Sequence, residues 1–81
     1  MTSTEIHEKL TSVFRRVFDD PKLTIGETTT ASDVEGWDSL VNVSLMVAVE
    51  KAFGVRFTTK EVQALANVGE LMQLIERRLK K

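Results

Sequence analysis

The sequence predicts an all-α fold, a four-helix bundle with a long first loop and a short third helix. Apolar residues recur at helical spacing in three long segments, and capping pairs precede helical segments. An irregular stretch separates the first two of these segments. At 81 residues, the chain has room for one modest hydrophobic core. We therefore expect a single domain over residues 1–81.

The first helix is expected over residues 4–18. Thr2 and Glu5 form a plausible capping box before it, and Pro21 ends it because the residue before a proline is pushed out of the helical region. The apolar residues of this segment share one helical stripe: Ile6, Leu10, Val13, Phe14, Val17 and Phe18.

A long loop is expected over residues 22–37. This stretch has no helical period and is rich in Thr, Gly, Ser and Asp. Loops of this length are uncommon in compact domains and are often functional. We expect Leu23, Ile25 and Val34 to fix the loop to the core.

The second helix is expected over residues 39–53, with Gly54 as its C-terminal cap. Either Asp38 or Ser39 could cap its N-terminus. The helix is unusually apolar for a surface helix, so part of its apolar surface is expected to remain exposed. The residues expected to face inward are Leu45, Met46, Val49 and Phe53.

Two further helices complete the bundle. The short third helix begins at Thr58 or Thr59, with Glu61 as the partner of Thr58 in a capping box, and it ends by Ala66. The fourth begins near Asn67, and its stripe consists of Val68, Leu71, Met72, Ile75 and Leu79. We expect Phe14, Leu45 and Phe53 to be core residues.

Composition excludes several classes of function. The chain has no cysteine, so disulfides and thiolate metal sites are excluded. The sequence has no basic face with interleaved aromatic residues, so it gives no indication of nucleic-acid binding. The longest purely apolar run, residues 45–49, is too short to cross a membrane, and the N-terminus lacks the apolar region of a signal peptide. A cytoplasmic monomer is the expected form.

Ser39 first suggests a nucleophilic enzyme, and the surrounding sequence does not support one. A catalytic serine needs a base within reach and a group that orients this base. The only histidine is His7, in the first predicted helix beside charged residues, where we expect it to be a solvated surface residue. No G-x-S-x-G motif surrounds Ser39. We therefore expect no enzymatic activity.

The stretch "GWDSLVNVSLMVAVEKAFGVRF", with Asp38-Ser39-Leu40 at the start of the second helix, resembles the carrier-protein family. This family comprises acyl carrier proteins and their peptidyl and D-alanyl relatives. The apolar pattern that follows, Glu50, and the Phe53-Gly54 pair agree with it, as do the order and lengths of the predicted helices. The resemblance extends from Ile6 to Leu79.

The resemblance implies that Ser39 receives a 4′-phosphopantetheine arm from coenzyme A by the action of a separate transferase. Ser39 would then need no base of its own. An anionic phosphodiester there would lie at a helix N-terminus, which favours negative charge. The resemblance also assigns Asp38 to recognition by the transferase rather than to a structural role. The implied partners are this transferase and the enzymes that load and process acyl or aminoacyl groups.

A docking surface is expected on the outward face of the second helix. Apolar residues in this face, beside a modified serine, favour contact with partner enzymes. The sequence departs from housekeeping fatty-acid carriers, whose second helix is strongly acidic, and so indicates a specialised lipid or polyketide-type pathway. An aminoacyl carrier and an unmodified interaction module are the alternatives. The expected docking residues are Leu40, Val41, Ser44, Val47 and Glu50.

Overall fold

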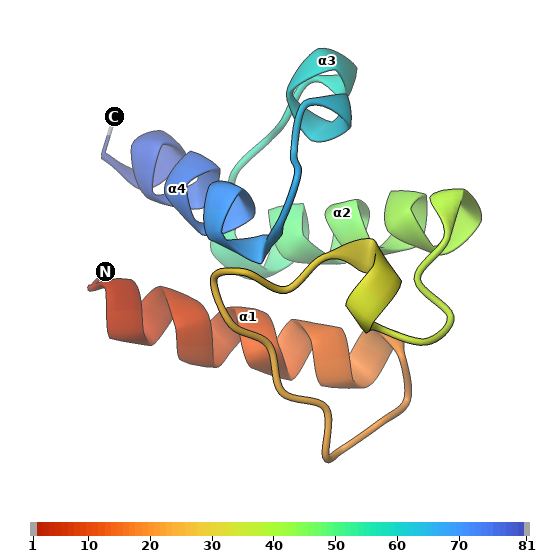
Figure 1. Ribbon diagram of the computed structural model, residues 1–81. Coiled ribbons are helices and arrows are strands. Elements are labelled where there is room, and N and C mark those ends of the chain that lie inside the picture. The colour runs from red at the N-terminus through yellow and green to blue at the C-terminus, as the bar shows by residue number, and fades with distance from the viewer. Residues whose placement is uncertain (1, 81) are drawn as a thin grey trace.

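The computed structural model describes residues 2–80, which form helices joined by loops (Figure 1). Over these residues the fold is all-helical, as predicted, and α2 lies alongside α1 and runs back in roughly the opposite direction. The short α3 stands beyond α2 and α4, at the edge of the bundle. The elements in chain order are α1 (Ser3–Val17), the 3₁₀ turn η1 (Ala31–Asp33), α2 (Ser39–Phe53), α3 (Thr59–Gln63) and α4 (Val68–Leu79).

Capping pairs start the helices where the sequence predicts them. The Thr2 hydroxyl accepts the Glu5 N–H at 3.1 Å, and the Glu5 carboxylate accepts the Thr2 N–H at 2.8 Å. This backbone N–H holds the pKa of Glu5 below its usual range, because it stabilises the charged carboxylate. Thr58 and Glu61 form the same box at α3, and the Thr58 N–H lowers the pKa of Glu61.

The core lies where α1 packs against α2 and α4. The predicted core residues Phe14, Leu45 and Phe53 are all buried, as are the other predicted inward residues of α2. Gly54 ends α2 in the left-handed conformation, with φ at +66°, as its predicted role as a cap requires. The side chains that are almost completely buried are Ile6, Leu10, Val13, Phe14, Leu45, Val49, Val68, Leu71 and Ile75.

The first loop packs onto the bundle and caps α4. Ile25 and Val34 are buried, as predicted, and Leu23 packs against the core. The Thr29 carbonyl accepts the Val68 N–H at 2.8 Å, and the Glu27 carbonyl accepts the Gly69 N–H at 2.8 Å. These N–H groups belong to the first turn of α4 and have no partner within the helix. The loop therefore satisfies donors that α4 would otherwise leave open.

Gly69→Ala is expected to lower the free energy of unfolding by about 1–3 kcal/mol. A Cβ atom at this position would lie 2.7 Å from the Glu27 carbonyl oxygen, and a backbone atom can move away only if the loop moves with it. This cost exceeds the gain of about 1 kcal/mol that alanine brings to a helix. Urea denaturation measures the effect.

Gly26→Ala is the matched control, since a Cβ there meets its nearest atom, the Thr29 hydroxyl oxygen, at 3.9 Å. It should change stability by less than about 1 kcal/mol. Equal losses in the two variants would contradict the proposed steric role of Gly69.

His7 corrects one prediction. It was expected to be a solvated surface residue, but it is half-buried and its Nε2 lies 2.6 Å from the Ile25 carbonyl oxygen. The prediction was wrong because the loop folds back over α1 and brings this carbonyl to the histidine. His7 thus helps to hold the loop. No helix within residues 2–80 is long and apolar enough to cross a membrane.

Candidate functional site

Ser39 is the first residue of α2 and is exposed. The first hydrogen bond within the helix runs from the Asn42 N–H to the Asp38 carbonyl, at 2.9 Å. The N–H groups of Ser39 and Leu40 precede this bond and remain directed out of the helix end. An anion attached to the Ser39 hydroxyl would therefore lie beside free donors at the positive end of the helix dipole.

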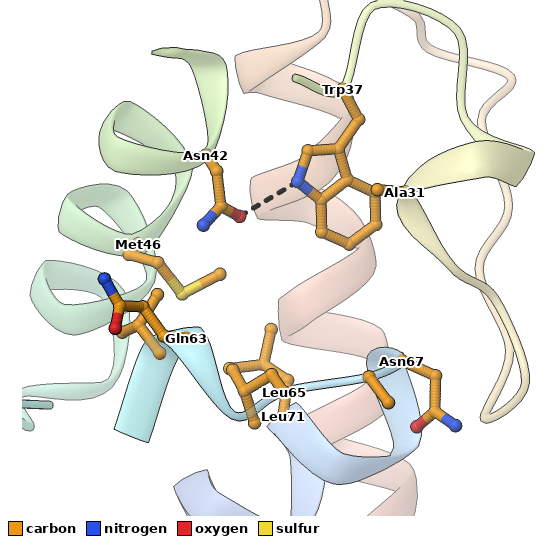
Figure 2. Close-up of a pocket in the computed structure, with 10 residues that line it drawn as sticks. Ala31, Trp37, Asn42, Met46, Gln63, Leu65, Asn67 and Leu71 are labelled. Carbon is orange, nitrogen blue, oxygen red and sulfur yellow. Dashed lines mark hydrogen bonds between the residues drawn. The ribbon is translucent and has the colours of Figure 1, made fainter. Parts of the chain in front are cut away.

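The approach to Ser39 is shaped by a turn and an aromatic anchor. Gly36 has φ at +86°, a conformation that favours glycine, and it directs the chain into Trp37. The Trp37 ring meets Phe14 edge-on at 5.2 Å between ring centroids, and its indole N–H donates to the Asn42 Oδ1 at 2.9 Å (Figure 2). Trp37 therefore ties the end of the loop to both α1 and α2, two residues before Ser39.

Asp38 is the N-terminal cap of α2. Its backbone is extended, and its Oδ1 accepts the Val41 N–H at 2.9 Å. The resemblance assigned Asp38 to recognition rather than to a structural role, and the denial of a structural role was wrong, because Asp38 caps α2. Because Asp38 caps the helix, the Ser39 hydroxyl is not needed for capping. The Ser39 hydroxyl can therefore accept a new group.

Asp38→Ala is expected to lower the free energy of unfolding by about 1 kcal/mol, because the Val41 N–H loses its acceptor. Asp38→Asn keeps a capping oxygen and should cost less than half of that. Thermal or urea denaturation of the two variants measures the difference. An Asp38→Ala protein as stable as the parent would show that the cap contributes nothing.

A groove of about 420 Å³ runs between α2 and α3 and begins at Ser39. Val43, Met46 and Val47 provide apolar surface on the α2 side, and Phe57 and Val62 provide it on the α3 side. Polar groups border the same groove: Asn42, Glu50, Thr58, Thr59 and Gln63. Such a surface suits a slender chain that alternates amide groups with hydrocarbon.

These features fit a 4′-phosphopantetheine group. Ser39 would hold its phosphate through the hydroxyl oxygen, and the open N–H groups of α2 would stabilise the negative charge. The groove would receive the arm, which carries amides and hydrocarbon in turn. The side chain of Ser39 is exposed, so an outside enzyme can reach it.

The expected docking residues differ in their exposure. Leu40 is 80% exposed and Val47 is 44% exposed, as expected, and the loop does not cover them. Ser44 is exposed, and Val41 is half-buried. Glu50 is half-buried too, and its Oε2 accepts the Phe57 N–H at 2.7 Å. The Glu50 carboxylate therefore helps to fix the segment that joins α2 to α3.

Val43 and Asn42 were absent from the predicted site. Val43 is 64% exposed and lies between Leu40 and Val47 on one face of α2, so the three form an apolar stripe. The spacing of three and four residues is the signal that could have revealed it. Asn42 was missed because its contact with Trp37 crosses from the loop to the helix.

Comparisons with known proteins agree with this geometry. The family model for the phosphopantetheine attachment site matches residues 8–75. An acyl carrier protein of Thermosynechococcus vestitus is 30% identical over 80 residues, which cover 98% of each chain. The solution NMR structure of holo acyl carrier protein from Geobacter metallireducens superposes with a TM-score of 0.85 and 38% identity, covering 91% of this chain and 85% of the other.

Proposed function

The chain belongs to the acyl carrier proteins of the phosphopantetheine-binding family, and on this basis we propose that Ser39 is the attachment residue. Proteins of this family carry a covalent 4′-phosphopantetheine and are carriers rather than enzymes. The attached group supplies a thiol that holds an acyl cargo as a thioester. The observation that carries the proposal is the exposed Ser39 hydroxyl at the N-terminus of α2, with open N–H groups around it.

The attachment chemistry requires little from this chain. The Ser39 oxygen would attack the phosphorus that joins phosphopantetheine to the nucleotide part of coenzyme A. The phosphodiester to Ser39 forms, the nucleotide part leaves, and the transferase takes the hydroxyl proton. Asp38 is proposed to take part in recognition by the transferase, beside its capping role. The chain provides an accessible hydroxyl and a site that stabilises the phosphate.

Intact mass spectrometry tests the assignment. The apo protein is incubated with coenzyme A, Mg²⁺ and a promiscuous phosphopantetheinyl transferase. The expected result is a mass gain of one phosphopantetheine group, located on Ser39 by peptide mapping. No gain, or a gain on another residue, would overturn the attachment proposal.

A specialised lipid or polyketide-type pathway is proposed as the setting. The face of α2 that borders Ser39 presents the stripe of Leu40, Val43 and Val47 rather than a row of acids, and the chain carries a net charge of only −1. Steering of basic partners by charge should therefore be weak, and contacts should be more apolar. Val41 and Ser44 lie on the same helix, and Glu50 borders the surface.

A kinetic comparison tests specialisation. The holo protein is offered to general fatty-acid synthase enzymes next to a general carrier, at low and high salt. Lower turnover and a weaker dependence on salt are expected. Turnover and salt dependence equal to those of the general carrier would contradict a specialised role.

A further inference from the structure

The charge carried by the chain changes sign near the end of α2. Residues 23–50 hold five acids and no base, whereas residues 51–60 hold three bases and no acid. From Ser39 to the first of these bases, α2 rises by about 18 Å. The bases therefore lie at and beyond the end of α2 that is remote from Ser39, where the chain leaves for α3 (Figure 1). The three bases, all exposed, are Lys51, Arg56 and Lys60.

No carboxylate pairs with these three bases in the part of the chain that the structure describes. The ion pairs there join Arg78 to Glu61 and Lys80 to Glu76. Glu50 precedes the first base, but it is half-buried and its Oε2 accepts a backbone N–H of the segment that joins α2 to α3. The charges of the three bases are therefore free to meet a partner.

A hollow joins the apolar stripe of α2 to the first two of these bases, Lys51 and Arg56, which we call the basic end. The hollow has a volume of about 360 Å³, and Val47 of the stripe lines it together with both bases. The Arg56 carbonyl accepts the Arg78 Nε–H at 3.1 Å, so α4 holds the backbone of this segment. The stripe and the basic end thus form one surface along α2.

The charge pattern of this surface indicates the kind of partner that fits it. Glu35 and Asp38 are exposed beside Ser39, at the opposite end from the bases. A membrane or a nucleic acid spread along α2 would bring negative charge against these acids as well as against the basic end. A protein can confine its carboxylates to the basic end and present apolar side chains to the stripe, and such complementary charges fix the orientation of a complex.

We propose that the partner enzymes of this chain bind the apolar stripe and the basic end together, and that they present carboxylates to Lys51 and Arg56. The proposal rests on the proposed carrier function and names the partner chemistry of its docking surface. The charge contact lies remote from Ser39, so it would set the direction in which α2 lies on the partner. Such partners differ from the basic partners that suit a carrier with an acidic second helix.

Two synthetic helical peptides test the chemistry of the basic end. They share one row of leucines, and one end carries glutamates in the first peptide and glutamines in the second. Each is titrated into the ¹⁵N-labelled apo protein at low salt. The glutamate peptide should bind about fivefold tighter, as two exposed ion pairs imply, and should shift the amide signals of Val47, Lys51 and Arg56. This preference should vanish at high salt.

Neutral variants locate the preference. In the double variant Lys51→Gln/Arg56→Gln, the two peptides should bind equally well. Lys22→Gln/Arg77→Gln is the matched control, because it removes the same charge at two exposed positions that line neither the hollow nor the groove. The control should keep the fivefold preference. Circular dichroism verifies that both variants are folded, which is expected because all four side chains are exposed.

Charge reversal tests the same surface on enzymes. The holo forms of the parent, of Lys51→Glu/Arg56→Glu and of Lys22→Glu/Arg77→Glu are offered to general fatty-acid synthase enzymes. The first reversal should raise kcat/KM at least fivefold, since it makes the basic end resemble the acidic surface that suits these enzymes. The second reversal should leave kcat/KM within about twofold of the parent value.

The results separate the proposal from its alternatives. Equal affinity for the two peptides, or a preference that persists in Lys51→Gln/Arg56→Gln, would overturn the proposed partner chemistry. So would binding to vesicles of equal parts phosphatidylcholine and phosphatidylglycerol that the same double variant loses, because it would assign the basic end to a membrane. The peptides are titrated into apo protein, so their result is independent of the arm. Failure to produce the holo forms would instead refute the attachment at Ser39.

Discussion

Ser39→Ala should abolish phosphopantetheine attachment and leave the free energy of unfolding within about 0.5 kcal/mol of the parent value. The hydroxyl oxygen is the atom that would form the new phosphodiester, and alanine has no replacement for it. Stability should be preserved because Asp38, and not Ser39, caps α2, and Ser39 is exposed. Alanine is also a better helix former than serine.

Intact mass and urea denaturation, measured on one preparation, give both halves of this result. The Ser44→Ala variant is the matched control, because Ser44 is an exposed serine of the same helix. It should be modified like the parent protein. Modification that persists in Ser39→Ala would show that another residue carries the arm, and a large loss of stability would show that Ser39 supports the fold.

Phe14→Ala should lower the free energy of unfolding by about 3–5 kcal/mol. Phe14 is fully buried and contacts Phe18 and Trp37, at 5.8 and 5.2 Å between ring centroids. Its removal would leave a cavity at the junction of α1, the first loop and α2. A loss of this size is a large part of the stability of a small domain, so much of the protein is expected to be unfolded at physiological temperature.

Chemical denaturation followed by circular dichroism measures this loss. Leu40→Ala is the control, since it also truncates a large apolar side chain, but one that is 80% exposed. Its effect on stability should stay within about 0.5 kcal/mol. A Phe14→Ala protein that lost less than about 1 kcal/mol would show that the aromatic cluster is not needed for the core.

Local signals in the sequence were sufficient for the helices. Each helix has its own start signal, and the three long segments also show apolar residues at helical spacing, so Thr2, Thr58 and Asn67 were identified without knowledge of the tertiary structure. Gly54 was found for the same reason, since a glycine after an apolar helix commonly ends it. Ser39 could be singled out because its motif is contiguous in the chain.

Contacts between distant segments were not predictable in this way. The bond of His7 to the Ile25 carbonyl and the bond of the Glu50 carboxylate to the Phe57 N–H depend on how the chain folds back. The orientation of Asn42 depends on Trp37, five residues earlier, across the junction of loop and helix. A periodic pattern indicates which face of a helix is buried, but not which backbone group a side chain will meet.

The hydrogen bonds from the Val68 and Gly69 N–H groups to the first loop mean that this loop helps to stabilise α4. A proteolytic cut near Glu27 or Thr29 would release the acceptors of these two amides. The first turn of α4 would then fray, and its buried leucines would lose their support. Nicking of the loop and rapid hydrogen exchange in α4 should therefore occur together, although the two segments are far apart in the chain.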